Sequence, residues 1–146
     1  MAGVPLGSKV AALHELQSAW LEPCLRAEGL SWSTFQLLVT ISGIGTASQV
    51  DIARDLGVTP ATLSESVHSL VGRGLVEQVP GERDRRVKVL RLTSAATAKL
   101  AKVRTSASEC EKVMVDGVSQ RDLEACSKVL DALIGRLEQA LTPAGR

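Results

Sequence analysis

Residues 49–70 restrict the fold more than any other segment, because two amphipathic stretches meet there with almost no chain between them. Only Val58 and Thr59 separate the glycine that stops the first stretch from the start signal of the second. Ala53 is small enough for two helices to cross closely, and Gly57 can adopt the positive φ that a sharp turn requires. The two stretches are therefore expected to pack against each other at an angle.

The second stretch begins with strong helix-start signals. Thr59 is a good N-cap, and Pro60 fits the first helical position because its missing N–H is not needed there. Leu63, Val67 and Leu70 then follow at helical spacing and form one apolar face. A small residue, a turn glycine and apolar positions at these spacings predict a helix-turn-helix, with two packed helices that have no role in DNA binding as the alternative.

A short hairpin is expected directly after this motif. Leu75–Val79 and Val87–Leu92 have the composition of strands, and Pro80-Gly81 opens the loop between them. The net charge is only +1, but residues 80–91 hold five basic and two acidic groups, whereas residues 1–53 hold two basic and four acidic groups. A basic hairpin after a helix-turn-helix predicts the winged variant, in which the fourth helix enters the major groove and the hairpin reaches the backbone or the minor groove.

The rest of the chain is expected to be helical, so the fold class is mainly α with a small β-hairpin. Residues 31–93 form the winged helix-turn-helix lobe, and residues 1–30 and 94–146 form a helical dimerisation region, all within one intertwined domain. The dimer is inferred because the terminal helices carry more apolar surface than one small lobe can cover; the alternative is that they close a monomer core. Pro23 is expected to kink or shorten the first helix. Helices are predicted over 8–28, from Ser31, from Thr46, from Thr93 or Ser94 to Gly117, and from Ser119 onward.

The outward face of the fourth helix follows from its apolar face. Ala61, Glu65 and His68 point outward, with Thr62 and Ser64 beside them. Small residues at the helix start allow a close approach to DNA, and the two hydroxyls can bond phosphates or bases. A carboxylate in the major groove can accept a hydrogen bond from the N4 amino group of cytosine. The alternative is that the glutamate and the histidine are only solvated.

From about Leu30 to Thr93 the sequence resembles MarR-type transcriptional regulators. The motifs are L-S-W-S-T-F-Q-L-L, D-I-A-R-D-L-G-V-T-P-A-T-L-S, L-V-G-R-G-L-V-E and D-R-R-V-K-V-L-R-L-T. The resemblance implies that Arg86, with Arg85 as a second candidate, enters the minor groove while Asp84 braces the wing arginine. Glu65 departs from the family, which often has arginine at this position, so a different operator is expected.

The resemblance implies an intertwined homodimer that binds a pseudo-palindromic operator and acts as a transcriptional regulator, a repressor in the first instance. Three widely spaced cysteines without a C-x-x-C pair, together with the lack of a secretory signal, indicate the reducing cytoplasm. The resemblance also implies release by a small anionic or phenolic ligand bound between the dimer helices and the lobe. Trp20 and Trp32 are the candidate ligand-binding residues, with packing in the core as their alternative role. The candidate DNA-binding residues are Thr59, Pro60, Ala61, Thr62, Ser64, Glu65, His68, Arg83, Asp84, Arg85 and Arg86.

Other functions find less support in the sequence. There is no phosphate-binding glycine loop and no nucleophile–histidine pair, so no enzyme and no cofactor are expected. The two histidines lie in different elements, which argues against a metal site. No apolar run is long enough to span a membrane, and no secretory signal is seen. The alternatives kept open are a protein-interaction module built on the same winged helix and a redox-responsive regulator that uses Cys24.

Overall fold

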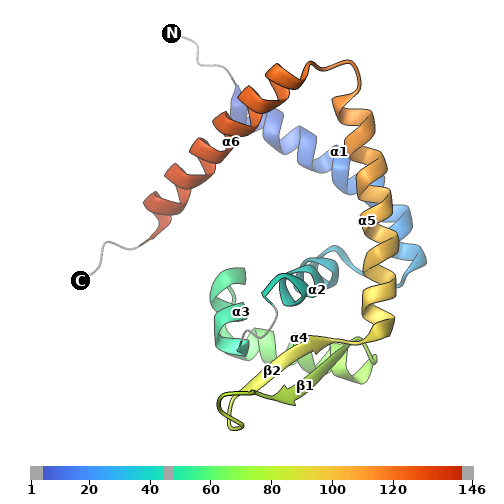
Figure 1. Ribbon diagram of the computed structural model, residues 1–146, viewed down its shortest axis with the longest axis vertical. Coiled ribbons are helices and arrows are strands. Elements are labelled where there is room, and N and C mark those ends of the chain that lie inside the picture. The colour runs from blue at the N-terminus through green and yellow to red at the C-terminus, as the bar shows by residue number, and fades with distance from the viewer. Residues whose placement is uncertain (1–4, 45–47, 143–146) are drawn as a thin grey trace. The chain divides into compact units, whose positions relative to one another are not determined.

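The computed structural model describes residues 5–44 and 48–142, and these residues form six helices and one two-stranded antiparallel hairpin (Figure 1). The expected mainly α fold with one small hairpin is therefore confirmed. The chain divides into two compact units, residues 1–108 and residues 109–146, and each is described by itself. The elements are α1 (Leu6–Ala27), α2 (Trp32–Ile44), α3 (Gln49–Leu56), α4 (Pro60–Gly72), β1 (Val76–Pro80), β2 (Lys88–Leu92), α5 (Ser94–Val115) and α6 (Gln120–Leu141).

The turn between α3 and α4 has the predicted geometry. Gly57 has φ 65°, and the N–H of Val58 donates to the carbonyl of Ala53 at 3.0 Å, so the exposed end of α3 is closed. Ala53 itself is buried. Thr59 caps α4, and Pro60 is its first residue. The residues at the turn were thus sufficient to predict the connection between α3 and α4.

The core of the first unit lies beneath α4 and the hairpin. Leu63 and Val67 of α4 are buried, as are Leu38 of α2 and Leu90 of β2. The same cluster continues into the second half of α1 and the first half of α5, so these helix segments and the hairpin share one core. Its further members from α1 and α5 are Leu21, Leu25, Ala96, Leu100 and Val103.

The expectation that Pro23 ends the first helix early is wrong. Helix α1 continues through Pro23 to Ala27, because Pro23 is exposed and Leu21 and Leu25, on either side of it, are buried and hold the helix against the core. Helix α3 is capped by Ser48, whose Oγ accepts a hydrogen bond from the N–H of Asp51 at 3.3 Å. The expected start at Thr46 lies outside the described residues.

The hairpin is closed at its tip by main-chain hydrogen bonds. Val79 pairs with Val89 and Pro80 with Lys88, and the loop follows. The N–H of Gly81 donates to the carbonyl of Val87 at 2.8 Å, which joins the two ends of the loop. On the other side of β2, Ser48 forms an isolated antiparallel bridge with Val89, so the start of α3 is attached to the hairpin.

Thr93 attaches the base of the hairpin to α5. Its N–H donates to the carbonyl of Leu75 at 3.1 Å and its hydroxyl donates to the carbonyl of Gly74 at 2.7 Å. The same oxygen accepts from the N–H of Ala96 at 3.2 Å, so Thr93 rather than Ser94 is the N-cap of α5. One side chain therefore fixes both the end of β2 and the start of α5.

The turn between α1 and α2 is held by side chains from distant parts of the chain. Arg73, at the end of α4, donates to the carbonyl of Gly29. Lys99 donates to the carbonyl of Glu28 at 2.7 Å, and Lys102 donates to the Glu28 carboxylate at 2.9 Å. The hydrogen bond from Lys102 lowers the pKa of Glu28, and the same contact raises the pKa of Lys102. Side chains at the end of α4 and in α5 thus both hold the turn between α1 and α2.

The second unit contains the end of α5, a turn and α6. Gly117 has φ 73° in the turn, and Ser119 accepts a hydrogen bond from the N–H of Asp122 at 3.1 Å, so Ser119 is the N-cap of α6, where the sequence predicted the helix to start. No residue of α6 is buried. Its apolar residues Ile134 and Leu137 are 54% and 65% exposed, although the sequence places them at spacings typical of a packed helix face.

Candidate nucleic-acid-binding surface

The start of α4 is exposed and carries short side chains, so a ligand can approach it closely. The hydroxyl of Thr59 accepts a hydrogen bond from the N–H of Thr62 at 3.2 Å, and the two hydroxyls lie 2.9 Å apart. Pro60, Ala61 and Thr62 are all exposed. Since the first turn of a helix presents a partial positive charge and short side chains cover it little, a phosphate or base edge can reach the backbone here.

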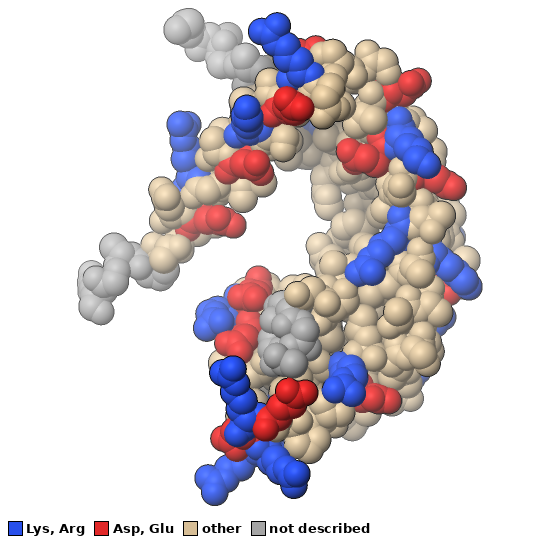
Figure 2. Space-filling view, viewed as in Figure 1, with Lys and Arg blue, Asp and Glu red and all other residues tan. Residues whose placement is uncertain are grey.

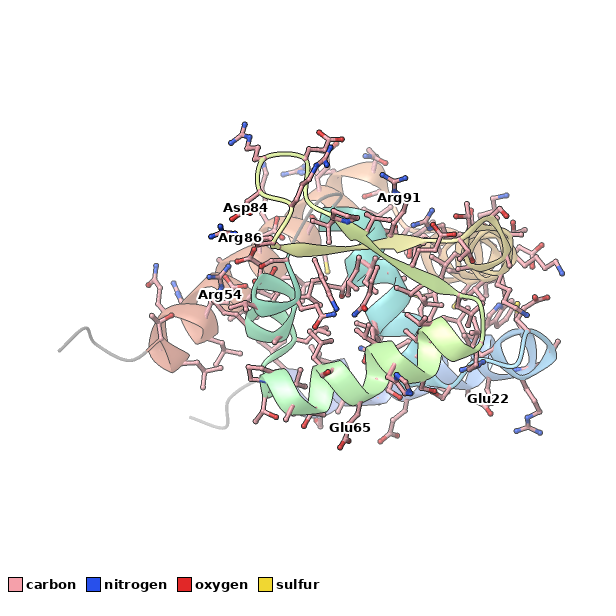
Figure 3. All side chains as sticks on the ribbon, turned by 90° about the horizontal axis from the view of Figure 1, so that it is seen from below. Glu22, Arg54, Glu65, Asp84, Arg86 and Arg91 are labelled. Atoms are coloured by element: carbon pink, nitrogen blue, oxygen red, sulfur yellow. The ribbon has the colours of Figure 1, made fainter. Side chains whose placement is uncertain are left out.

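The outward face of α4 is the one predicted from the sequence. Ser64, Glu65 and His68 are exposed, whereas Leu63 and Val67 on the opposite side are buried. Figure 3 shows Glu65 projecting from α4 on the side away from the hairpin. The helix contains no lysine or arginine, so its exposed face offers hydroxyls, an imidazole and a carboxylate but no permanent positive charge.

The basic residues lie on the hairpin instead. Arg83, Arg85 and Arg86 are exposed in the loop, and Lys88 and Arg91 are exposed on β2. Lysine and arginine side chains gather at this end of the lobe in Figure 2. Guanidinium groups on a narrow, exposed loop are suited to phosphates and to the minor groove.

Asp84 organises the loop through the main chain. Its Oδ1 accepts a hydrogen bond from the backbone N–H of Arg86 at 2.9 Å. The N–H of Val87 donates to the carbonyl of Asp84 at 3.1 Å, so the aspartate is fixed at two points. The contact therefore positions the backbone of Arg86, while its guanidinium remains exposed. The contact between Asp84 and Arg86 is thus a hydrogen bond to the backbone N–H of the arginine and not an ion pair with its guanidinium.

The predicted DNA-binding residues thus fall on two surface elements of one lobe. The predicted residues among 59–68 are exposed at the start of α4, and those among 83–86 are exposed in the hairpin loop. Figure 3 shows Asp84 and Arg86 on the hairpin side of the lobe and Glu65 on the outer side of α4. The elements share a core, since Leu63 of α4 and Leu90 of β2 are members of one cluster.

Sequence reasoning did not single out Arg54, which is exposed on α3. Its guanidinium lies 2.9 Å from Asp51 and 3.9 Å from Asp55, so acidic neighbours offset its charge. Ser48 donates to the Asp51 carboxylate at 2.8 Å, and this hydrogen bond is the main reason why the pKa of Asp51 is lowered. The sequence signal for this ion pair is the spacing of three residues between Asp51 and Arg54, which places both side chains on one face of a helix.

The two tryptophans occupy different surroundings. Trp32 packs edge-on against His14 of α1, with ring centroids 5.7 Å apart, and lies 5.6 Å from the ring of Phe35. Trp20 is 43% exposed on α1. A groove of about 520 Å³ lies elsewhere, on the hairpin, and is lined by residues 79–84 with Val87, Val89 and Arg91.

Three further features bear on the alternatives. Cys24 is half-buried against the core, Cys110 is buried, Cys126 is exposed, and all three are free thiols. Within residues 5–44 and 48–142, no group of three or more His, Cys, Asp or Glu side chains is arranged to hold a metal ion. In the same part of the chain, no helix is both long and apolar enough to cross a membrane.

A helix-turn-helix followed by a hairpin that shares its core defines a winged helix-turn-helix protein. The sequence model of the MarR family matches residues 28–87, which include α2 to α4, β1 and the hairpin loop. This segment belongs to the MarR family, and the resemblance stated from the motifs is confirmed.

Solved structures share this fold over most of the chain. The transcriptional regulator PA3341 is 25% identical, with 92% of this chain and 98% of that chain covered and a TM-score of 0.75. A mutant of MarR from E. coli in complex with operator DNA is 18% identical, with coverages of 89% and 94% and a TM-score of 0.71. The transcriptional repressor CouR, bound to a 23-mer DNA duplex, is 22% identical, with coverages of 88% and 92% and a TM-score of 0.71. The last two likenesses concern the fold alone.

Proposed function

We propose that this protein represses transcription as a homodimer that binds a pseudo-palindromic operator in the cytoplasm, and that a small anionic or phenolic ligand releases it. The coarse class, a DNA-binding transcriptional regulator of the MarR family, rests on the family match and on structural neighbours that include complexes with DNA. No catalytic role is assigned to any residue.

The observation that carries the proposal is that one lobe with a shared core presents both an exposed helix start with short side chains and an exposed loop with arginines. Thr59 to Glu65 present small and polar side chains that fit the major groove. Arg85 and Arg86 are exposed on a loop that Asp84 holds in shape. In our proposal, α4 reads base edges while the hairpin contacts phosphates and the adjacent minor groove.

The test uses the full-length protein and fluorescently labelled duplexes selected from a randomised pool. The double variant Arg85→Ala with Arg86→Ala should bind the selected duplex at least a hundredfold more weakly and show a smaller dependence on salt. Arg26→Ala, which removes an exposed arginine of α1, is the matched control and should bind within about twofold. Equal binding by the double variant and the wild type would favour the protein-interaction module instead.

The homodimer is supported by the apolar surface of the terminal helices. In α6, Val129, Ile134 and Leu137 are at least half exposed, and in α1, Val10 and Leu16 are 50% and 70% exposed. Apolar surface of this extent marks an interface in a soluble protein, and a second copy supplies a matching face because a two-fold interface is self-complementary.

The oligomeric state gives a direct test. Light scattering at micromolar concentration should report a dimer for the wild type. Leu137→Glu on the apolar face of α6 should shift the population toward monomer, whereas Gln139→Glu, an exposed polar position on the same helix, should not. A stable wild-type monomer at this concentration would contradict the dimer.

The ligand proposal rests on Trp20 and Trp32, which are both accessible in part. Benzoate and 2-hydroxybenzoate are suitable probes, since they combine an aromatic ring with a carboxylate. Binding near either ring should quench tryptophan fluorescence, release the duplex, and lose its optical signal in the corresponding Trp→Phe variant. The redox alternative predicts instead that peroxide weakens DNA binding by the wild type and leaves Cys24→Ser unaffected.

A further inference from the structure

Glu65 has an unpaired carboxylate on the surface assigned to DNA. It lies in the second turn of α4, is exposed, and makes no hydrogen bond or ion pair with any residue that the structure describes. Figure 3 shows it projecting freely from the helix. Other carboxylates of the same lobe are held by cations: Glu28 by Lys102 at 2.9 Å and Asp51 by Arg54 at 2.9 Å.

No basic residue of α4 compensates this charge. The helix contains neither lysine nor arginine, so Glu65 is its only permanently charged side chain. If this carboxylate faced a phosphate, it would weaken binding to every sequence alike. If it faces the base edges, it repels bases that present acceptors and attracts those that present donors. Its position near the start of the helix, after Ala61 and Thr62, places it where a helix in the major groove contacts bases.

The major groove offers only two kinds of hydrogen-bond donor, the N4 amino group of cytosine and the N6 amino group of adenine. The adenine amino group lies between two acceptors, N7 of adenine and O4 of the paired thymine. The cytosine amino group has an acceptor, O6 of the paired guanine, on one side only. A carboxylate is therefore repelled less at cytosine than at adenine, and guanine and thymine present it with no donor.

We propose that Glu65 specifies a cytosine in each half-site by accepting a hydrogen bond from its N4 amino group. This inference rests on the proposed function and adds that Glu65 selects cytosine. The affinity then comes from the hairpin arginines, and Glu65 contributes discrimination. Replacing that cytosine by another base should weaken binding about tenfold, which corresponds to 1.4 kcal/mol.

The experiment compares base preferences in a randomised duplex pool for the wild type, Glu65→Gln and Glu65→Arg. The wild type should enrich cytosine at one position of each half-site. Glutamine should shift that position to adenine, to which it can bond in a bidentate manner, and arginine should shift it to guanine. Glu77→Gln, which removes an exposed carboxylate from β1, is the control for charge alone and should leave the preference unchanged.

The outcomes separate this inference from the function on which it rests. If Glu65→Gln tightens binding to all sequences equally and keeps the wild-type preference, the carboxylate faces phosphate and the inference is overturned, while the regulator remains. If the wild type enriches no sequence at all, the proposed function itself fails. A change of preference at the same position in both Glu65 variants, and not in the Glu77 variant, supports the assignment.

Discussion

Gly81 is the residue of the hairpin loop where a single methyl group has no room. A Cβ at this position would lie 2.8 Å from the carbonyl oxygen of Asp84 and 3.3 Å from that of Val87. Both oxygens belong to the main chain of the loop, so neither can turn aside as a side-chain end could. Because a Cβ atom is essentially never found closer than 3.0 Å to another heavy atom, Gly81→Ala must displace the loop.

The cost of this displacement follows from the contacts that it disturbs. Overpacking typically costs about 1–3 kcal/mol, and the hydrogen bond from the N–H of Gly81 to Val87, 2.8 Å long, contributes about 1 kcal/mol. We therefore expect Gly81→Ala to lower the free energy of unfolding by about 1–3 kcal/mol. Since the same loop presents Arg86 through Asp84, we also expect operator binding to weaken about tenfold for each half-site.

Urea denaturation and fluorescence anisotropy measure the two effects at one fixed protomer concentration, because the stability of the proposed dimer would depend on concentration. Gly43→Ala is the matched control: it lies in α2 and its added Cβ meets no described atom within 4 Å. Alanine there should keep or raise stability by up to about 1 kcal/mol and leave DNA binding unchanged. The reasoning is refuted if Gly81→Ala unfolds at the wild-type urea concentration and binds the operator normally.

Three further perturbations test the supports of the lobe. Thr93→Val should lower the free energy of unfolding by about 2 kcal/mol, from the lost cap and the unpaired carbonyl of Gly74, whereas Thr93→Ser should retain most of it in urea denaturation. The pKa of Glu28 is lowered in the folded protein, so its carboxylate stabilises the fold above its ordinary pKa of 4.5, and this stabilisation is lost as the pH falls through the folded pKa. Glu28→Gln should therefore remove this part of the loss of stability that urea denaturation measures between pH 6 and pH 3. Arg73→Ala should free the end of α4 and weaken operator binding about tenfold with little loss of nonspecific binding, and wild-type discrimination in this variant would contradict its positioning role.

The features that were predicted correctly depend on neighbours in sequence. Gly57, Thr59 and Pro60 determine a turn and a helix start through their own backbone preferences, and these preferences do not need the rest of the chain. The helical spacing of Leu63, Val67 and Leu70 likewise predicted which face of α4 is buried. The same spacing predicts the exposed position of Glu65, whereas Arg86 was indicated by the resemblance of its motif to the family.

The features that were missed depend on contacts between distant residues. Pro23 remains helical because Leu21 and Leu25 are anchored in a core that local rules do not describe. Arg73 reaches the carbonyl of Gly29, 44 positions away, and Lys99 reaches that of Glu28, 71 positions away. Such pairs leave no periodic trace in the sequence, because each requires one long side chain and one free carbonyl.

The separation of charge between the hairpin and α4 has a consequence for how an operator is found among other sequences. Residues 83–91 carry five basic groups, whereas α4 carries none. If the protein binds DNA as proposed, the release of counterions at the hairpin favours its retention on nonoperator DNA and its sliding along the duplex. Helix α4 would then enter and leave successive grooves, so we expect the search along the duplex and the recognition of its target to depend on different elements of one lobe.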